Sequence, residues 1–109
     1  MLAAILESGE PSRLYTALSL LVSTAAEGEP ARGLVSFGAL GPLLEGRFEP
    51  ALAELRATAG ELENLQLWAC AAAVEATGAD RAAVERTLDG VMSTPRFLRE
   101  TAGARLVVV

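Results

Sequence analysis

Short apolar runs alternate with longer segments of helical character along the whole chain, and this alternation restricts the fold more than any other feature. The apolar runs, interpreted as strands, span residues 2–6, 33–37, 65–69, 91–92 and 105–109. The helical segments span residues 11–28, 50–60, 71–78, 80–88 and 95–103, and residues 38–46 are interpreted as a loop with a short helix. Repeated strand–helix succession predicts a three-layer α/β/α architecture, in which a mostly parallel sheet of four or five strands has helices on both faces.

The size and composition of the chain predict one domain, residues 1–109. Hydrophobic residues make up 51% of the sequence, which is enough to build a core and argues against disorder. Much of this content is alanine, and aromatic residues are few. Because alanine buries little area, we expect closely packed helices and further burial at a subunit interface.

The charge and the missing residue types exclude several classes of function. The net charge is −5, and the nine basic residues are all arginines scattered along the chain, which disfavours nucleic-acid binding. The absence of histidine excludes Cys–His and Ser–His hydrolases. It also leaves only one cysteine and dispersed carboxylates as metal ligands, so we expect neither a metal nor a cofactor.

Cysteine usage and the first residues predict the compartment. A single cysteine forms no internal disulfide, which is typical of a reducing environment. The first apolar run ends at Glu7, has no basic region before it and is too short for a signal peptide or a membrane span. We therefore expect a cytoplasmic protein that does not enter a membrane.

Four loops are expected at one edge of the sheet, because right-handed crossovers bring all strand-to-helix connections to the carboxyl ends of parallel strands. These are residues 8–11, residues 38–42, the turn at Cys70 and residues 90–95. Ligands of open α/β sheets bind at this edge. The glycines of the first two loops match no Walker or dinucleotide fingerprint, so plain turns are the better interpretation.

Cys70 is the leading candidate for covalent chemistry. It follows the strand at residues 65–69 and precedes an alanine-rich helix that Gly78 ends. Free backbone N–H groups at a helix start favour an anion, and the thiolate is the nucleophilic form of cysteine. A buried, unreactive core cysteine is the alternative interpretation of the same residue.

Together with this order of elements, three segments of the chain resemble the DsrE-like family of small sulfur-relay proteins. They are residues 8–18 (SGEPSRLYTAL), residues 68–73 (WACAAA), and residues 89–98 (DGVMSTPRFL) with the terminal RLVVV. The resemblance implies a three-layer, Rossmann- or flavodoxin-like α/β fold. It also implies a homo- or hetero-oligomer, often a trimer or hexamer, and a cysteine at position 70 that holds sulfur as a persulfide.

Two functions therefore stay open. In the first, the protein is a cytosolic sulfur carrier or sulfurtransferase-like protein, in which Cys70 takes sulfane sulfur from a donor protein and passes it to a partner thiol. Arg13, Arg96 or Arg99 would add positive potential. In the second, it is a non-catalytic oligomeric interaction or regulatory module with an inert Cys70. A small-ligand or nucleotide-binding flavodoxin-like domain is a third, weaker interpretation, since no fingerprint supports it.

We also predict a homo-oligomer, because a domain of this size buries only part of its surface alone. The apolar segment Leu40, Leu43 and Leu44 is one expected contact surface. Trp68 is the other; it is expected to pack between sheet and helices or against a neighbouring subunit.

Overall fold

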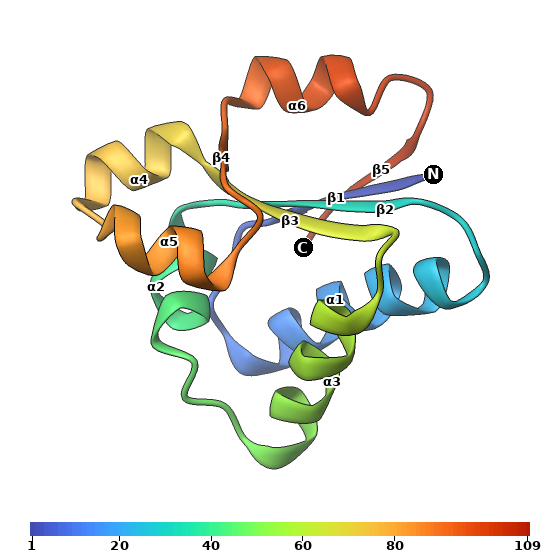
Figure 1. Ribbon diagram of the computed structural model, residues 1–109, viewed down its shortest axis with the longest axis horizontal. Helices are drawn as coiled ribbons and strands as arrows, with labels where there is room; N and C mark the ends of the chain where they lie inside the picture. The colour runs from blue at the N-terminus through green and yellow to red at the C-terminus, as the bar shows by residue number, and fades with distance from the viewer.

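The computed structural model describes residues 1–109 and confirms the alternation of strands and helices (Figure 1). The strands are β1 (Leu2–Leu6), β2 (Ala31–Val35), β3 (Leu65–Cys70), β4 (Val91–Met92) and β5 (Arg105–Val108). The helices are α1 (Pro11–Ala26), α2 (Phe37–Glu45), α3 (Pro50–Glu61), α4 (Ala71–Thr77), α5 (Arg81–Thr87) and α6 (Thr94–Glu100). No helix combines the length and the apolar character needed to cross a membrane.

The five strands form one all-parallel sheet, which confirms the expected mostly parallel sheet of four or five strands, and the structure gives their order as β4-β3-β2-β1-β5. The first three crossovers step across the sheet in one direction. The last crossover returns over the whole sheet and places β5 beside β1, with Leu2 opposite both Ala31 and Arg105. The first strand of the chain is therefore an interior strand, and the last strand is an edge.

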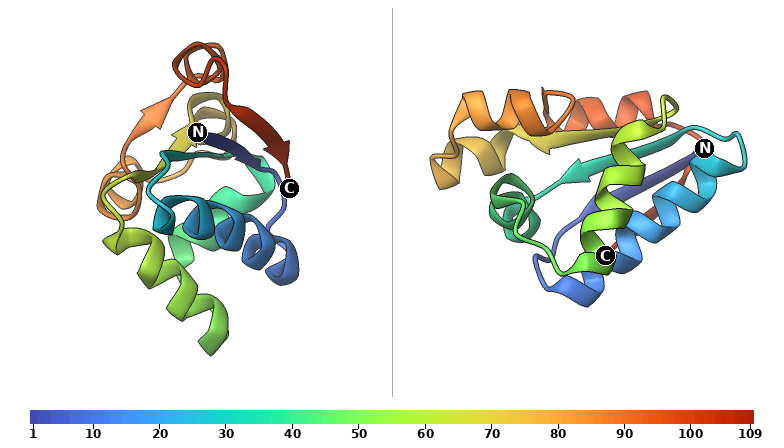
Figure 2. Two further views of the ribbon diagram at one scale, coloured as in Figure 1. Left: turned by 90° about the vertical axis from the view of Figure 1, so that its right-hand side faces the viewer. Right: turned by 60° about the horizontal axis from the view of Figure 1, so that its bottom comes forward.

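This reversal distributes the helices unequally between the two faces of the sheet. Because crossovers keep one handedness, a connection that runs backwards passes over the opposite face. Figures 1 and 2 show α1 and α3 beneath the sheet and α6 above it. We call these the α1 face and the α6 face. Residues at alternate positions of each strand point to one face or the other.

The α1 face is fully packed, and helix α1 supplies its largest side chains. Pro11 opens the helix, and apolar residues then recur at helical spacing, with Leu14, Leu18 and Leu21 completely buried. Gly33 of β2 gives this helix room, because a Cβ there would lie 3.2 Å from the Leu21 side chain.

Glu10 caps the start of α1. Its carboxylate accepts the hydroxyl of Ser12 at 2.6 Å and the backbone N–H groups of Ser12 and Arg13 at 3.3 Å. The hydrogen bond from the Ser12 side chain is the main reason that the pKa of Glu10 lies below its usual value. The ionised carboxylate therefore stabilises the helix start.

The α6 face is thinly covered. Phe97 is the one fully buried large side chain of α6, and the Thr101 hydroxyl donates to the Phe97 carbonyl at 2.8 Å, after the last turn. On β5 the side chains of Leu106 and Val108 remain 50% and 65% exposed. Leu106 pairs with Ala3 and Val108 pairs with Ile5, and this register places the side chains of Leu106 and Val108 on the α6 face.

Residues 37–45 differ from the sequence-based expectation of a loop with a short helix, because α2 begins directly after β2 and occupies the whole segment. Two glycines and Pro42 made this segment resemble a loop. Pro42 lacks the N–H that would bond the Gly38 carbonyl, and that carbonyl instead approaches Gly9. Strand β2 also begins at Ala31 rather than at Gly33.

Candidate functional site

Cys70 lies where the sequence places it, at the carboxyl end of β3 and the start of α4. It is the last residue of the strand and the N-cap of the helix, with extended backbone angles. The first N–H groups of a helix have no partner within it, but the Cys70 side chain accepts a hydrogen bond from none of them. Alternation along β3 puts Cys70 on the α6 face with Gln66 and Trp68.

The side-chain hydrogen-bond partner of the thiol is the hydroxyl of Thr94, whose Oγ1 lies 3.8 Å from Sγ. Thr94 is the first residue of α6, and Met92 of β4 pairs with Cys70 in the sheet. The sequence predicts residues 90–95 at this edge but does not single out Thr94 as a contact of Cys70. The position of Thr94 in the sequence could have indicated this contact. Thr94 follows β4 by two residues, and because β4 pairs with β3, the residues after both strands lie at the same edge of the sheet.

The thiol is buried. Cys70 is only 3% exposed, and it lines none of the main cavities of the protein. The start of α6 at Thr94 covers the thiol from the α6 side. A reagent or a partner thiol therefore reaches Sγ only if this cover moves.

The three arginines considered for the site do not contact the thiol. Arg13 lies in the first turn of α1, whose buried side chains pack on the opposite face of the sheet. Arg96 and Arg99 lie on α6, where Arg96 forms an ion pair with Glu100 at 3.4 Å. The side-chain hydrogen-bond partner of the thiol is instead the Thr94 hydroxyl.

The prediction that four loops lie together at the carboxyl edge of the sheet is confirmed for the loops after β1 and β2. A Cβ at Gly9 or Gly38 would strike the backbone of the other loop, at the Gly38 carbonyl and the Glu7 carbonyl respectively. Gly90 is different, because it precedes β4 and lies against the ring of Trp68, where an added Cβ would be 3.1 Å from Cζ3. The connection after β4 at the carboxyl edge is instead Ser93, which caps the start of α6.

The expectation that Leu40 and Leu43 contact a neighbouring subunit is wrong. Leu40 and Leu43 are buried in the core on α2, so they are not available to a neighbour, whereas Leu44 is half-buried. The helical spacing of α2 turns these leucines inward, which an interpretation of this segment as a loop does not anticipate. Trp68 is half-buried and lines a cavity beneath α6.

A second polar group of residues lies at the other end of β3. The Arg56 guanidinium donates to the Thr87 carbonyl at 2.7 Å, and the Asp89 carboxylate accepts the Leu67 N–H at 2.8 Å. Burial lowers the pKa of Arg56, and the charge of Asp89 opposes this effect. These contacts tie α3 and the turn before β4 to the sheet, which is a structural role. No cluster of three or more His, Cys, Asp or Glu side chains is arranged to hold a metal ion.

No family model and no curated protein matches the sequence. Among solved structures, the chain is similar to the YchN protein of E. coli, with a TM-score of 0.70 and 14% identity over 99% of this chain and 97% of that one. It is also similar to MTH1491, a protein of unknown function from Methanobacterium thermoautotrophicum, with a TM-score of 0.68 and 19% identity over the same shares. The chain therefore has the YchN/DsrE-like fold, with a five-stranded all-parallel sheet and six helices.

Proposed function

We propose that the protein is a cytoplasmic sulfur carrier, in which Cys70 accepts sulfane sulfur from a donor protein as a persulfide and passes it to the thiol of an acceptor protein. The position of Cys70 carries this proposal. The thiol lies at the carboxyl edge of a parallel sheet and at the start of a helix, in a fold of the YchN/DsrE-like type. It is also the only cysteine, so no internal disulfide competes for it.

The transfer step needs no oxidant. The Cys70 thiolate attacks the outer sulfur of a donor persulfide, R–S–SH, so that a new Sγ–S bond forms. The donor S–S bond breaks, its electron pair stays on the donor sulfur, and the donor leaves as a thiolate. Attack by the acceptor thiolate on the outer sulfur of the Cys70 persulfide repeats the same exchange.

The groups around Sγ suit the negative charge that appears in both steps. Cys70 lies at the positive end of the α4 dipole, although its side chain accepts no hydrogen bond from the first N–H groups, and the Thr94 hydroxyl at 3.8 Å is its side-chain hydrogen-bond partner. Because the thiol is covered, we propose that docking of the donor displaces the start of α6 and exposes Sγ.

The burial of Cys70 is the observation that favours the alternative function, a non-catalytic interaction module. At 3% exposure the side chain behaves as a small core residue beside Met92. In that case the fold serves assembly or regulation, and the thiol is inert.

Self-assembly belongs to both functions, and we propose a homo-oligomer, a trimer or hexamer. The exposed apolar side chains of Leu98, Leu106 and Val108 on α6 and β5 are the surface that a second copy would cover. Light scattering at micromolar concentration tests this, and a mass of 11.3 kDa would contradict it.

Mass spectrometry distinguishes the two functions. The native protein is incubated with a protein persulfide donor, and the carrier function predicts the gain of one sulfur atom that is lost again on addition of a thiol. Cys70→Ser should abolish the gain, while circular dichroism shows the fold unchanged. If the native protein gains no sulfur but the urea-unfolded protein does, the interaction module is the correct function.

A further inference from the structure

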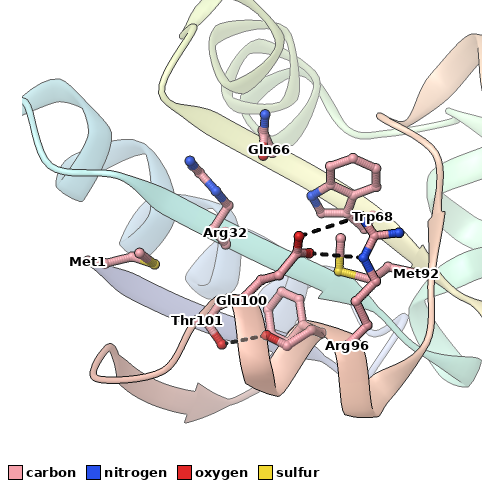
Figure 3. A pocket seen from close by; sticks show the side chains of 9 residues that line it. Met1, Arg32, Gln66, Trp68, Met92, Arg96, Glu100 and Thr101 are labelled. Carbon is pink, nitrogen blue, oxygen red and sulfur yellow. Dashed lines mark hydrogen bonds and ion pairs between the residues drawn. The ribbon is translucent and has the colours of Figure 1, made fainter.

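A cavity of about 370 Å³ lies between α6 and the sheet, on the α6 face, and its volume is within the range of about 300–1,000 Å³ that small-molecule sites occupy. Its floor comes from β2 and β3 and its wall from α6 (Figure 3). The cavity is separate from Cys70, which does not line it. The side chains on its floor are Arg32, Gln66 and Trp68.

Trp68 offers a fixed planar surface. Its six-membered ring packs over Gly90, where an added Cβ would lie 3.1 Å from Cζ3 and 3.4 Å from Cε3, so the ring has little freedom on that side. The indole N–H has no acceptor within the protein, although it belongs to a half-buried side chain. Figure 3 shows the indole beside the side chain of Arg96, at one end of the labelled group.

Arg32 brings an anchored positive charge without a carboxylate partner. Its Nη1 donates to the backbone carbonyls of Ala31 and Asn64 at 3.0 and 2.9 Å, which holds the guanidinium in place. The two ion pairs of the protein join Met1 to Glu29 and Arg96 to Glu100, and neither includes Arg32. Its Nε and Nη2 donors have no acceptor in the protein, so they are free for a ligand.

The register of the sheet sets the spacing of these groups. Arg32 pairs with Gln66 across β2 and β3, and the amide of Gln66 has no hydrogen-bond partner in the protein. Trp68 lies two residues further along β3, which is about 6.6 Å at the usual rise of a strand. A ligand whose ring lies against Trp68 can therefore place a substituent attached directly to that ring on Arg32 and Gln66.

The rim of the cavity does not cancel the charge of Arg32. Glu100 is the one carboxylate among the lining residues, and Arg96 already pairs with it at 3.4 Å. Among the lining side chains, the donors without a partner on Arg32 and Gln66 thus outnumber the free acceptors, and one positive charge is left over. This balance favours an anionic ligand with a flat apolar body.

We propose that this cavity binds a small planar carboxylate, with its conjugated ring against Trp68 and its carboxylate on Arg32 beside Gln66. The guanidinium and amide donors recognise the charge, and the indole face selects a flat ring over a puckered one. This binding is independent of the sulfur-carrier function, because it does not use Cys70.

The test uses benzoate as the probe and the emission of Trp68, the sole tryptophan, as the readout. Titration should give a saturable change in emission. Benzamide, which lacks the charge, and cyclohexanecarboxylate, which lacks the plane, should each bind at least about tenfold more weakly. No saturable change with benzoate, or equal binding of either analogue, would overturn the proposal.

Variants locate the site. Arg32→Gln should weaken benzoate binding at least about tenfold, whereas the matched control Arg99→Gln, on the same helix as Arg96 but outside the cavity, should not. Gln66→Leu removes an amide that has no hydrogen-bond partner in the protein, so it should weaken benzoate binding without affecting folding. If Arg32→Gln unfolds, this variant tests the site in its place. Cys70→Ser should bind as tightly as the native protein. If Gln66→Leu binds benzoate as tightly as the native protein, and the two arginine variants lose affinity equally, benzoate does not bind in this cavity.

Discussion

The two faces of the sheet differ in how completely helices cover them. On the α1 face, Leu14, Leu18 and Leu21 of one long helix are completely buried, and α3 packs against that helix. On the α6 face, a helix of seven residues anchored by Phe97 covers the same five strands, so a cavity and exposed β5 side chains remain. Cys70 and Trp68 both belong to the thinly covered face. The comparison indicates that one face supplies stability and the other is free to carry chemistry and contacts.

Truncation of one leucine on each face tests this comparison most strongly. Leu18→Ala removes a fully buried side chain and should cost about 2–5 kcal/mol of unfolding free energy, because it leaves a cavity that the packed helix cannot close. Leu106→Ala, at a half-exposed position, should stay within about 0.5 kcal/mol. Because Leu106 belongs to the proposed subunit contact, urea unfolding of both variants is measured at a protein concentration where light scattering shows a monomer, and comparable losses would contradict a difference between the faces.

Two glycines give the next largest effect. Gly38→Ala should destabilise the protein by about 1–3 kcal/mol, because the new Cβ strikes the Glu7 carbonyl and backbone must move. Gly41→Ala in the same helix is the matched control, since nothing lies within 4 Å of its Cβ position. It should be neutral or stabilise the helix by up to about 1 kcal/mol. Thermal unfolding of the pair checks the prediction, and a loss in both variants would refute the role of close backbone approach.

Gly90→Ala probes the α6 face in a different way. Gly90 has φ +132°, which a non-glycine residue adopts only with strain of about 1–3 kcal/mol, and its Cβ would press on the Trp68 ring. The variant should therefore shift the emission of Trp68, whereas Gly38→Ala should leave that emission unchanged. An unaltered spectrum in Gly90→Ala would show that the ring is not held from this side.

The smallest effect is the pH dependence of the α1 cap. The pKa of Glu10 is lowered in the folded protein by the hydrogen bond from Ser12, so its contribution to stability is present above the unfolded pKa and is lost as the pH falls through the folded value. Glu10→Gln should lower the urea midpoint at neutral pH slightly and reduce its fall toward about pH 3. NMR titration of the Glu10 side chain checks the direction, and a pKa at or above the usual value would contradict it.

Much of the fold was predictable from local patterns. The runs at residues 2–6 and 65–69 had the apolar character of buried parallel strands, and Pro11, Pro50 and Pro95 lie in the first turns of their helices. The error at residues 38–46 came from Pro42, because nothing local indicates that the Gly38 carbonyl would be directed to Gly9 rather than into the helix.

The candidate site was predictable only in part. The sequence places Cys70 at a strand end because β3 and α4 have clear local signals. The depth of its burial depends on α6, which lies in the crossover from β4 to β5 that passes three strands. The cavity beneath α6 was missed for the same reason, since Arg32, Gln66 and Trp68 meet only through the register of β2 and β3.

The return of β5 to the side of β1 also sets the order in which the protein can be completed during synthesis. Residue 2 pairs with residue 105, and the Glu7 N–H bonds the Val109 carbonyl at 2.8 Å. At about 5–20 residues per second, the ribosome needs roughly 5–20 s to make the chain between these partners. For that interval one edge of β1 lacks its partner strand, and the nascent chain exposes an unpaired apolar strand that other chains can bind. The sheet is therefore complete only after β5 has been synthesised, and a block on the emergence of β5 leaves the protein open to aggregation.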